Sequence, residues 1–169
     1  FLVGGGNGDF ALARYDGTGT LDRAFGDHGR FLVPISNGGI DEGSAAVVQP
    51  DGKIVVVGSL AQSNLVVARF EANGAPDLTF GGGDALAIFD LGGTEGLRAV
   101  QLLPDGRIAA AGFADQLLVV VQLEADGDPD PQFGGGSGQV TTDLGGAGGM
   151  GLALARQSDG KLVVAGSRG

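Results

Sequence analysis

Short runs of apolar residues, separated by glycine-rich polar segments, recur along the whole chain. The middle of the chain predicts four strands, over residues 45–49, 53–58, 64–70 and 85–91. Side chains alternate between the two faces of a strand, so the third run carries Leu65, Val67 and Arg69 on one face and Val66, Ala68 and Phe70 on the other. Apolar residues on both faces are typical of a sheet that packs between other sheets.

Turn residues connect these strands. Pro50-Asp51-Gly52 lies between the first two runs, where proline favours a type I turn and glycine supplies the left-handed residue of a hairpin bulge. A longer structured turn over residues 73–81 separates the last two runs.

The same pattern returns every 54 residues. Asp51-Gly52-Lys53 recurs as Asp105-Gly106-Arg107 and as Asp159-Gly160-Lys161. A Phe-Gly pair begins at residues 25, 80 and 133, at nearly the same interval. Several markers on one period indicate an internal repeat, and each repeat is then one supersecondary unit.

One four-stranded antiparallel sheet per repeat predicts an all-β fold made of β-propeller blades, with about three repeat-equivalents. A solenoid has a shorter period, of about 20–30 residues. A doubly wound α/β fold needs helices, and the nearest helical candidate, residues 95–103, aligns with the first strand of a repeat.

We interpret residues 1–169 as a single repeat domain. Residues 1–36 supply the last strands of one blade, 45–91 and 98–143 form two blades, and 152–166 supply the first two strands of another. The chain starts at Phe1 inside a strand-like run, which predicts a processed product, a fragment or the ordered part of something longer. Closed propellers hold about 4–8 blades, so we expect either further blades or self-association, in which two chains that exchange half-blades would make six.

Three segments carry a resemblance to a known family, namely residues 9–15, 19–26 and 49–58. They resemble the delta-60 repeat, a tandem bacterial repeat. The third copy departs from the pattern, with Gln122 in place of arginine. The resemblance implies propeller blades, a bacterial origin and a secreted, periplasmic or cell-surface location, and it implies no catalytic residues.

Composition supports the all-β interpretation. Glycine accounts for 35 of 169 residues, but 43% of the chain is hydrophobic, which disordered chains do not reach. Aspartate outnumbers glutamate 16 to 4. Because aspartate favours turns and glutamate favours helix interiors, this ratio disfavours a helical protein.

Charge and cysteine content exclude several classes of function. The net charge is −10, and the ten Lys and Arg residues are scattered, which disfavours nucleic-acid binding. The longest apolar runs are far too short to span a bilayer, so we expect no membrane insertion. With no cysteine, the chain has neither disulfides nor thiolate metal sites.

An aspartate precedes each Phe-Gly pair by three residues, at positions 22, 77 and 130. We predict a structural role, in which the carboxylate accepts backbone N–H groups of the turn or pairs with the strand arginine of its own repeat, Arg14 or Arg69. An active site needs unlike groups, so an acid repeated in every blade is a poor catalytic candidate.

Asp126, Asp128 and Asp130 place three carboxylates at alternate positions, a spacing that calcium loops use. Pro131 stands where such a loop needs glycine and Ser137 where it needs glutamate. A solvated acidic turn is the preferred interpretation, and calcium is the one cofactor that this segment suggests.

Two further motifs favour structural interpretations. Residues 146–151 satisfy G-x-G-x-x-G, but a strand follows them where a dinucleotide site needs a helix, so we interpret them as a connection between blades. His28 is the only histidine and lies in a predicted surface turn with no partner for metal or base chemistry.

These observations favour a non-catalytic propeller module that acts as a scaffold or as a binding surface for a protein or glycan. The alternatives are a propeller hydrolase or lyase, with its site in the central channel, and a structural module that self-assembles.

Overall fold

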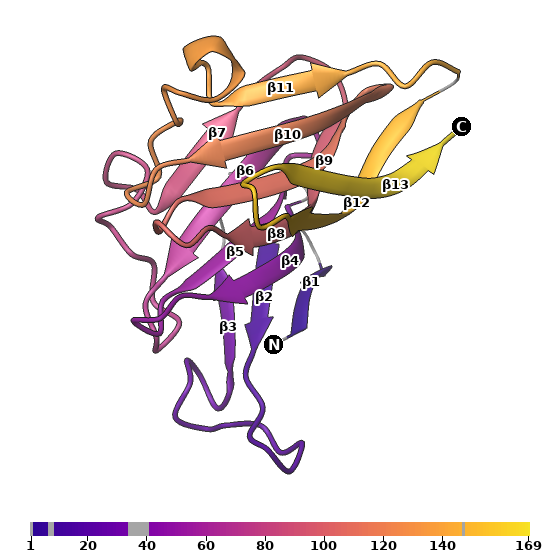
Figure 1. Ribbon diagram of the computed structural model, residues 1–169. Coiled ribbons are helices and arrows are strands. Elements are labelled where there is room, and N and C mark those ends of the chain that lie inside the picture. The colour runs from indigo at the N-terminus through magenta and orange to yellow at the C-terminus, as the bar shows by residue number, and fades with distance from the viewer. Residues whose placement is uncertain (1, 7–8, 34–40, 147) are drawn as a thin grey trace.

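Every sheet in the protein is antiparallel, as the computed structural model in Figure 1 shows for residues 2–6, 9–33, 41–146 and 148–169. Parts of the predicted N-terminal segment (1, 7–8 and 34–36) and residue 147 of the glycine-rich motif lie outside these described residues. Within the described residues there is no α-helix, and the one helical turn is the 3-10 segment η1, Gly134–Gly136.

The strands form four separate sheets in chain order. The first holds β1 (Leu2–Gly6), β2 (Asp9–Ala13) and β3 (Arg30–Val33). The second holds β4 (Glu42–Val48), β5 (Ile54–Leu60), β6 (Asn64–Phe70) and β7 (Leu86–Phe89). The third holds β8 (Glu95–Leu102), β9 (Ile108–Ala114), β10 (Leu117–Leu123) and β11 (Gln139–Thr142), and the fourth holds β12 (Gly149–Arg156) and β13 (Leu162–Arg168).

Each sheet is a meander whose strands pair in the order of the chain, as propeller blades do. The two complete sheets confirm the predicted fold class, and the two incomplete sheets flank them (Figure 1). The predicted hairpin turn is also present: Gly52 has φ +88°, and the N–H of Gln49 donates to the carbonyl of Lys53.

The first strand of each complete sheet begins earlier than the apolar pattern places it, at Glu42 rather than residue 45 and at Glu95 rather than residue 98. A bulge at Ser44 and another at Arg98 interrupt the alternation, and pairing continues beyond each bulge. A third bulge, at Leu152, interrupts β12.

Two hydrophobic clusters hold the first three sheets together. Side chains of β5 and β6 alternate between them, so Val56 and Val66 pack toward the first sheet while Val57 and Leu65 pack toward the third. All four are fully buried. Burial of each such side chain contributes about 1.5–3 kcal/mol, which makes sheet-to-sheet packing the main source of stability.

Candidate functional site

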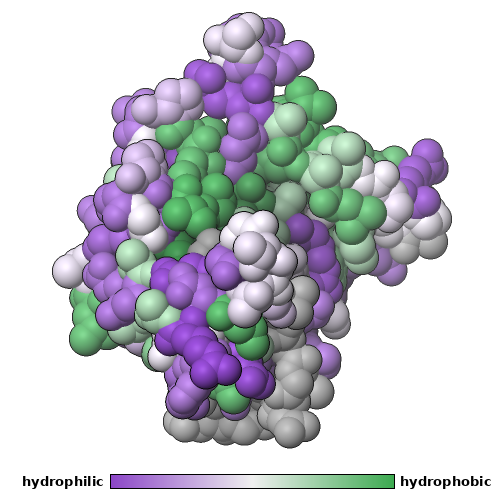
Figure 2. Space-filling model, turned by 90° about the horizontal axis from the view of Figure 1, so that it is seen from below, coloured by the Kyte–Doolittle hydropathy of each residue, from purple (hydrophilic) through white to green (hydrophobic). Residues whose placement is uncertain are grey.

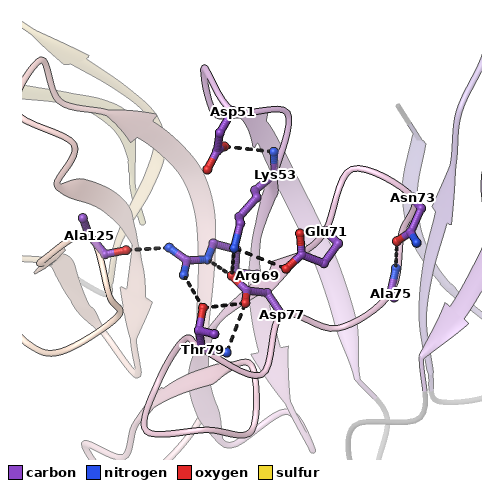
Figure 3. Close-up of polar contacts among 9 residues, drawn as sticks. All are labelled: Asp51, Lys53, Arg69, Glu71, Asn73, Ala75, Asp77, Thr79 and Ala125. Atoms are coloured by element: carbon purple, nitrogen blue, oxygen red, sulfur yellow. Dashed lines mark hydrogen bonds and ion pairs between the residues drawn. The ribbon is translucent and has the colours of Figure 1, made fainter.

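Arg69 and Asp77 form a buried ion pair at the end of β6 (Figure 3). The Nε of Arg69 lies 2.5 Å from Oδ2 of Asp77, and both residues are buried. Lys53, which directly precedes the neighbouring strand β5, donates to the same carboxylate oxygen at 2.8 Å. The hydroxyl and the backbone N–H of Thr79 donate to the other oxygen. The predicted pairing of the repeat aspartate with its strand arginine is therefore confirmed.

These donors control the charge of Asp77. Burial alone would raise its pKa, but the hydrogen bonds from Lys53, Thr79 and Arg69 outweigh burial and hold the pKa well below its ordinary value of 3.8. The ammonium of Lys53 also lies 3.2 Å from Glu71, and its hydrogen bond to Asp77 raises the pKa of Lys53. Both groups remain charged near neutral pH.

The guanidinium of Arg69 also joins its sheet to the next one. Its Nη1 donates to the carbonyl of Ala125, which follows β10 of the third sheet, at 2.5 Å (Figure 3). Its Cζ lies 4.5 Å from the ring centre of Phe80. Arg14 repeats the arrangement between the first and second sheets. It pairs with Asp22 and donates to the carbonyl of Ala72 at 2.7 Å. We call each arrangement of arginine, aspartate and next-sheet carbonyl a clasp.

The third repeat builds a shorter version of the clasp. Gln122 replaces the arginine and donates to Asp130 at 2.6 Å. Arg107, at the position of Lys53, supplies the positive charge to the same oxygen at 2.6 Å. The backbone N–H of Gln132, together with Arg107 and Gln122, holds the pKa of Asp130 below its ordinary value despite burial. The side chain of glutamine is shorter than that of arginine. The third repeat therefore keeps the contact with Asp130 inside its own sheet but loses the contact that arginine makes with the next sheet.

The bulges in the first strands gather a second set of side chains. β4, β8 and β12 lie side by side, and their bulged residues are Ser44, Arg98 and Leu152. Nη1 of Arg98 donates to the hydroxyl of Ser44 at 2.5 Å and lies 3.1 Å from the carboxylate of Glu42. Leu152 is 51% exposed. We call Ser44, Arg98 and Leu152 the bulge row.

A glycine in the second strand makes each bulge fit. A Cβ on Gly58, Gly112 or Gly166 would collide with the carbonyl oxygen of the residue two positions before the bulge. These glycines are 54 residues apart. The close approach of two backbones thus explains a glycine that the apolar pattern treats only as the end of a strand.

The bulge row differs from the clasps in one respect. The aspartate of the clasp and the following phenylalanine are the same in all three repeats, whereas the bulge row offers a hydroxyl, a guanidinium and an aliphatic side chain at equivalent positions. Bulges commonly re-aim side chains next to functional sites. Sequence reasoning missed this site, although the 54-residue spacing of the three glycines was a signal that could have located it.

The three aspartates of the calcium prediction lie in different surroundings. Asp130 is fully buried in the short clasp, whereas Asp126 and Asp128 are exposed. Oδ1 of Asp126 accepts the backbone N–H of Asp128 at 3.2 Å. Among the described residues, no three acidic or imidazole side chains gather in a way that could hold a metal ion. Calcium binding stays a prediction, and a calorimetric titration with Ca²⁺ tests it.

The remaining motif residues lie apart from both sets. His28 has φ +52° in an exposed turn, and its Nδ1 contacts the carboxylate of Asp27. A strand follows the glycine-rich motif as expected, but β12 begins at Gly149, so residues 149–151 belong to the strand and not to the predicted connection between blades. Sequence reasoning also missed Glu95, which is 1% exposed and accepts the N–H of Leu91 at 2.7 Å; burial raises its pKa.

Meander sheets of four strands, stacked through two apolar clusters and joined by clasps, define a β-propeller repeat protein. A family model described as "Domain of unknown function (DUF5122) beta-propeller" matches residues 1–25, 49–80 and 103–133, just over half of the chain. The chain belongs to this family. No curated protein matches it.

The matched segments coincide with the clasps. Each ends at the phenylalanine of a Phe-Gly pair, and each contains a clasp aspartate. A separate finding concerns membranes: among the described residues, no helix has the length and apolar character needed to cross a bilayer.

Proposed function

We propose that this chain is a non-catalytic propeller module that presents the bulge row as a binding surface for a protein or glycan, in a secreted or envelope-associated protein. The observation that carries this proposal is the contrast between the clasp aspartate, which is the same in all three repeats, and the bulge row, which differs at every position. A repeated framework positions the strands, and unlike side chains at one position of each blade supply recognition.

The state of the acidic groups supports a non-catalytic role. Strongly shifted carboxylates in a cleft are candidates for acid–base chemistry. Here the acids with the clearest partners, Asp77 and Asp130, are almost fully buried and accept hydrogen bonds from side chains of their own repeats. Neither offers an oxygen to a molecule outside the protein.

The bulge row has the chemistry of a recognition surface. The Cζ of Arg98 lies 5.4 Å from the ring centre of Phe113, in addition to the contacts with Ser44 and Glu42. A held guanidinium beside a hydroxyl and an aliphatic group suits a ligand with acceptor oxygens next to an apolar face. Sugars and peptides both meet this description.

Printed glycan and peptide arrays test the proposal. We expect the labelled chain to bind a subset of spots, and Arg98→Ala and Leu152→Ala each to weaken that binding by about tenfold or more. Ile88→Ala is the matched control, because Ile88 is 44% exposed on β7, away from the bulge row. Binding that is insensitive to Arg98 would contradict the proposed surface. Cleavage of a bound glycan or peptide would instead support the enzyme alternative.

A further inference from the structure

The face that each sheet turns toward the following sheet is buried to a different extent in the third sheet than in the first two. In the first two sheets, the side chains that point toward the following sheet are nearly inaccessible, as the exposures of Leu12, Phe25, Val67 and Phe80 show, at 1% or less. The equivalents of Val67 and Phe80 in the third sheet are Val120 and Phe133, which are only partly buried. By strand register, Val140 is the counterpart of Ala87, and the two are 39% and 8% exposed. The third sheet therefore carries the same apolar face without the same cover.

A groove of about 610 Å³ marks the uncovered area. Val120, Phe133 and Val140 line one wall, and Leu162 and Val164 of β13 line the other. β13 has a paired strand on one edge only, among the described residues. The groove thus lies beside an open strand edge, in the place that a third and a fourth strand occupy in the complete sheets.

The first sheet shows the opposite deficit. Tyr15 is 46% exposed, while its counterparts Phe70 and Leu123 are 1% and 0% exposed because a preceding sheet covers them. Hydrophobic side chains also gather in patches between hydrophilic ones on the face of the molecule drawn in Figure 2. Among the described residues, only a two-stranded sheet therefore follows the third sheet, and no sheet precedes the first.

In the first sheet, the glycine of the long turn lacks the phenylalanine ring that its counterparts contact. A Cβ on Gly74 or Gly127 would touch the ring of Phe25 or Phe80 of the preceding sheet, at 2.9 and 2.8 Å. A Cβ on the equivalent Gly19 would touch nothing within 4 Å. Phe133 has no such glycine against it among the described residues, and Gly19 has no such ring.

The compositions of β1 and β13 indicate which of these two strands pairs better with β2. β1 and β13 hold the same position in a blade, as second strands. β1 reads LVGGG, whereas β13 reads LVVAGSR. Glycine weakens a strand interior because it loses more conformational freedom on folding and has no side chain to pack. β13 is therefore the better partner for β2.

We propose that the groove receives β2 and β3 of a second copy of this chain, which pair with β13 and complete its sheet in the order β12-β13-β2-β3. β1 of the second copy gives up its place to β13. The exchange is reciprocal, so two copies share two composite blades and hold four complete ones. Six blades lie within the range of about 4–8 in which propellers close.

The proposed interface copies contacts that the chain already makes twice. Phe133 packs on Gly19 of the second copy, as Phe25 packs on Gly74. The N–H of Gly134 donates to the carbonyl of Thr18 of the second copy, as Gly26 donates to Asn73 at 3.1 Å and Gly81 to Asp126 at 2.9 Å.

Solution mass is the first test. We expect a dimer of twice 16.7 kDa by sedimentation equilibrium over a wide concentration range. A monomer at all concentrations would overturn the proposal and point to a further repeat, rather than a second copy, as the occupant of the groove. A ladder of species larger than a dimer would overturn the closed exchange.

A matched pair of substitutions tests the groove itself. Val140→Glu places a charge on the uncovered wall, where the side chain is already 39% exposed, and we expect at least tenfold weaker dimerisation with an unchanged circular dichroism spectrum. Ile88→Glu makes the same change on the equivalent strand of the second sheet, where exposure is 44%, and dimerisation should not change. Equal effects from both variants would count against the proposed interface.

A variant that is expected to dimerise more tightly tests the interface even if Val140→Glu unfolds. Gln122→Arg restores the guanidinium that reaches the next sheet in the other two clasps, and Asp130 accepts both donors as Asp77 accepts Lys53 and Arg69. We expect dimerisation about tenfold tighter, through a new charge-assisted hydrogen bond to the second copy. An unchanged dissociation constant would contradict a clasp between the third sheet and the second copy.

A disulfide tests which strands pair. In the register of β1 on β2, Leu2 lies opposite Ala13, and Val164 is the β13 residue equivalent to Leu2. The chain has no cysteine, so Ala13→Cys with Val164→Cys introduces the only thiols. We expect a covalent dimer after oxidation of the double variant and none from either single variant. A double variant that stays a non-covalent species would overturn the proposed pairing.

Discussion

Asp77 shows what a single side chain contributes in this protein. It is buried to 1% exposure, yet it stays ionised because Arg69, Lys53 and Thr79 all donate to it. Buried ion pairs are often neutral in net stability, but the loss of one partner leaves an uncompensated charge. The main effect of the clasp is therefore to specify how the strands and sheets are arranged, rather than to add net stability.

Substitution Asp77→Asn should destabilise the fold strongly. The change leaves Arg69 and Lys53 without their shared carboxylate, and we expect a loss of about 3–5 kcal/mol in the free energy of unfolding, measured by urea denaturation. Asp51→Asn is the control, because Asp51 is an exposed turn residue that accepts the backbone N–H of Lys53. Similar losses for the two variants would contradict the role of the clasp.

The same carboxylate gives the stability a defined pH dependence. The pKa of Asp77 in the folded chain is lower than its ordinary value of 3.8, so the stabilisation is present above about pH 4 and is lost as the pH falls toward the depressed pKa. We expect the difference in stability between the wild type and Asp77→Asn to shrink steadily below about pH 4, in urea titrations at a series of pH values. A difference that is constant down to about pH 2 would disagree with this assignment.

At the scale of elements, the bulge and the facing glycine form one unit. The bulge adds a residue to the first strand, and the glycine of the second strand gives the displaced carbonyl room. This pairing occurs in all three first strands of the described chain, while the bulged residue itself differs. The element therefore separates a constant backbone from a variable side chain.

Gly112→Ala should disrupt this unit. The new Cβ would overlap the carbonyl oxygen of Gly96, so the two strands must separate, and we expect a loss of about 1–3 kcal/mol in thermal or urea unfolding. Gly17→Ala is the matched control, since a Cβ there meets nothing within 4 Å. If both substitutions have equal effects, the close approach is not the reason for the glycine.

At the scale of the whole molecule, excess negative charge opposes compaction. The chain has twenty acidic residues and ten basic ones, and the clasps neutralise only a few of the acidic residues. Self-repulsion of this kind is long-ranged and is screened by salt, whereas buried pairs are screened much less.

Added salt should therefore stabilise the fold. We expect the melting temperature to rise by several degrees between about 10 mM and about 150 mM NaCl, because the Debye length falls from about 30 Å to about 8 Å. Differential scanning calorimetry measures this directly. A fall in melting temperature would mean that exposed ion pairs, rather than net repulsion, dominate the electrostatics.

Local patterns made most of the fold predictable. The alternation in 64–70 predicts β6 with the same bounds, and Pro50-Asp51-Gly52 predicts the hairpin turn. The repeat of aspartate before each Phe-Gly pair predicts the pairing of Arg69 with Asp77, because the two residues are only eight positions apart on a strand and its turn. Strand periodicity and turn chemistry are set by neighbours in the chain.

Contacts between sheets could not be predicted in the same way. The reach of Arg69 to the carbonyl of Ala125, the bulge at Arg98 and the burial of Glu95 each depend on the spacing between strands that are far apart in the sequence. By itself, the sequence determined the blades, their order and their internal ion pairs, since these follow from side-chain alternation and short-range geometry. Only the tertiary structure decided which side chains bridge blades and which remain uncovered, because that depends on how closely two backbones approach once the apolar faces have packed.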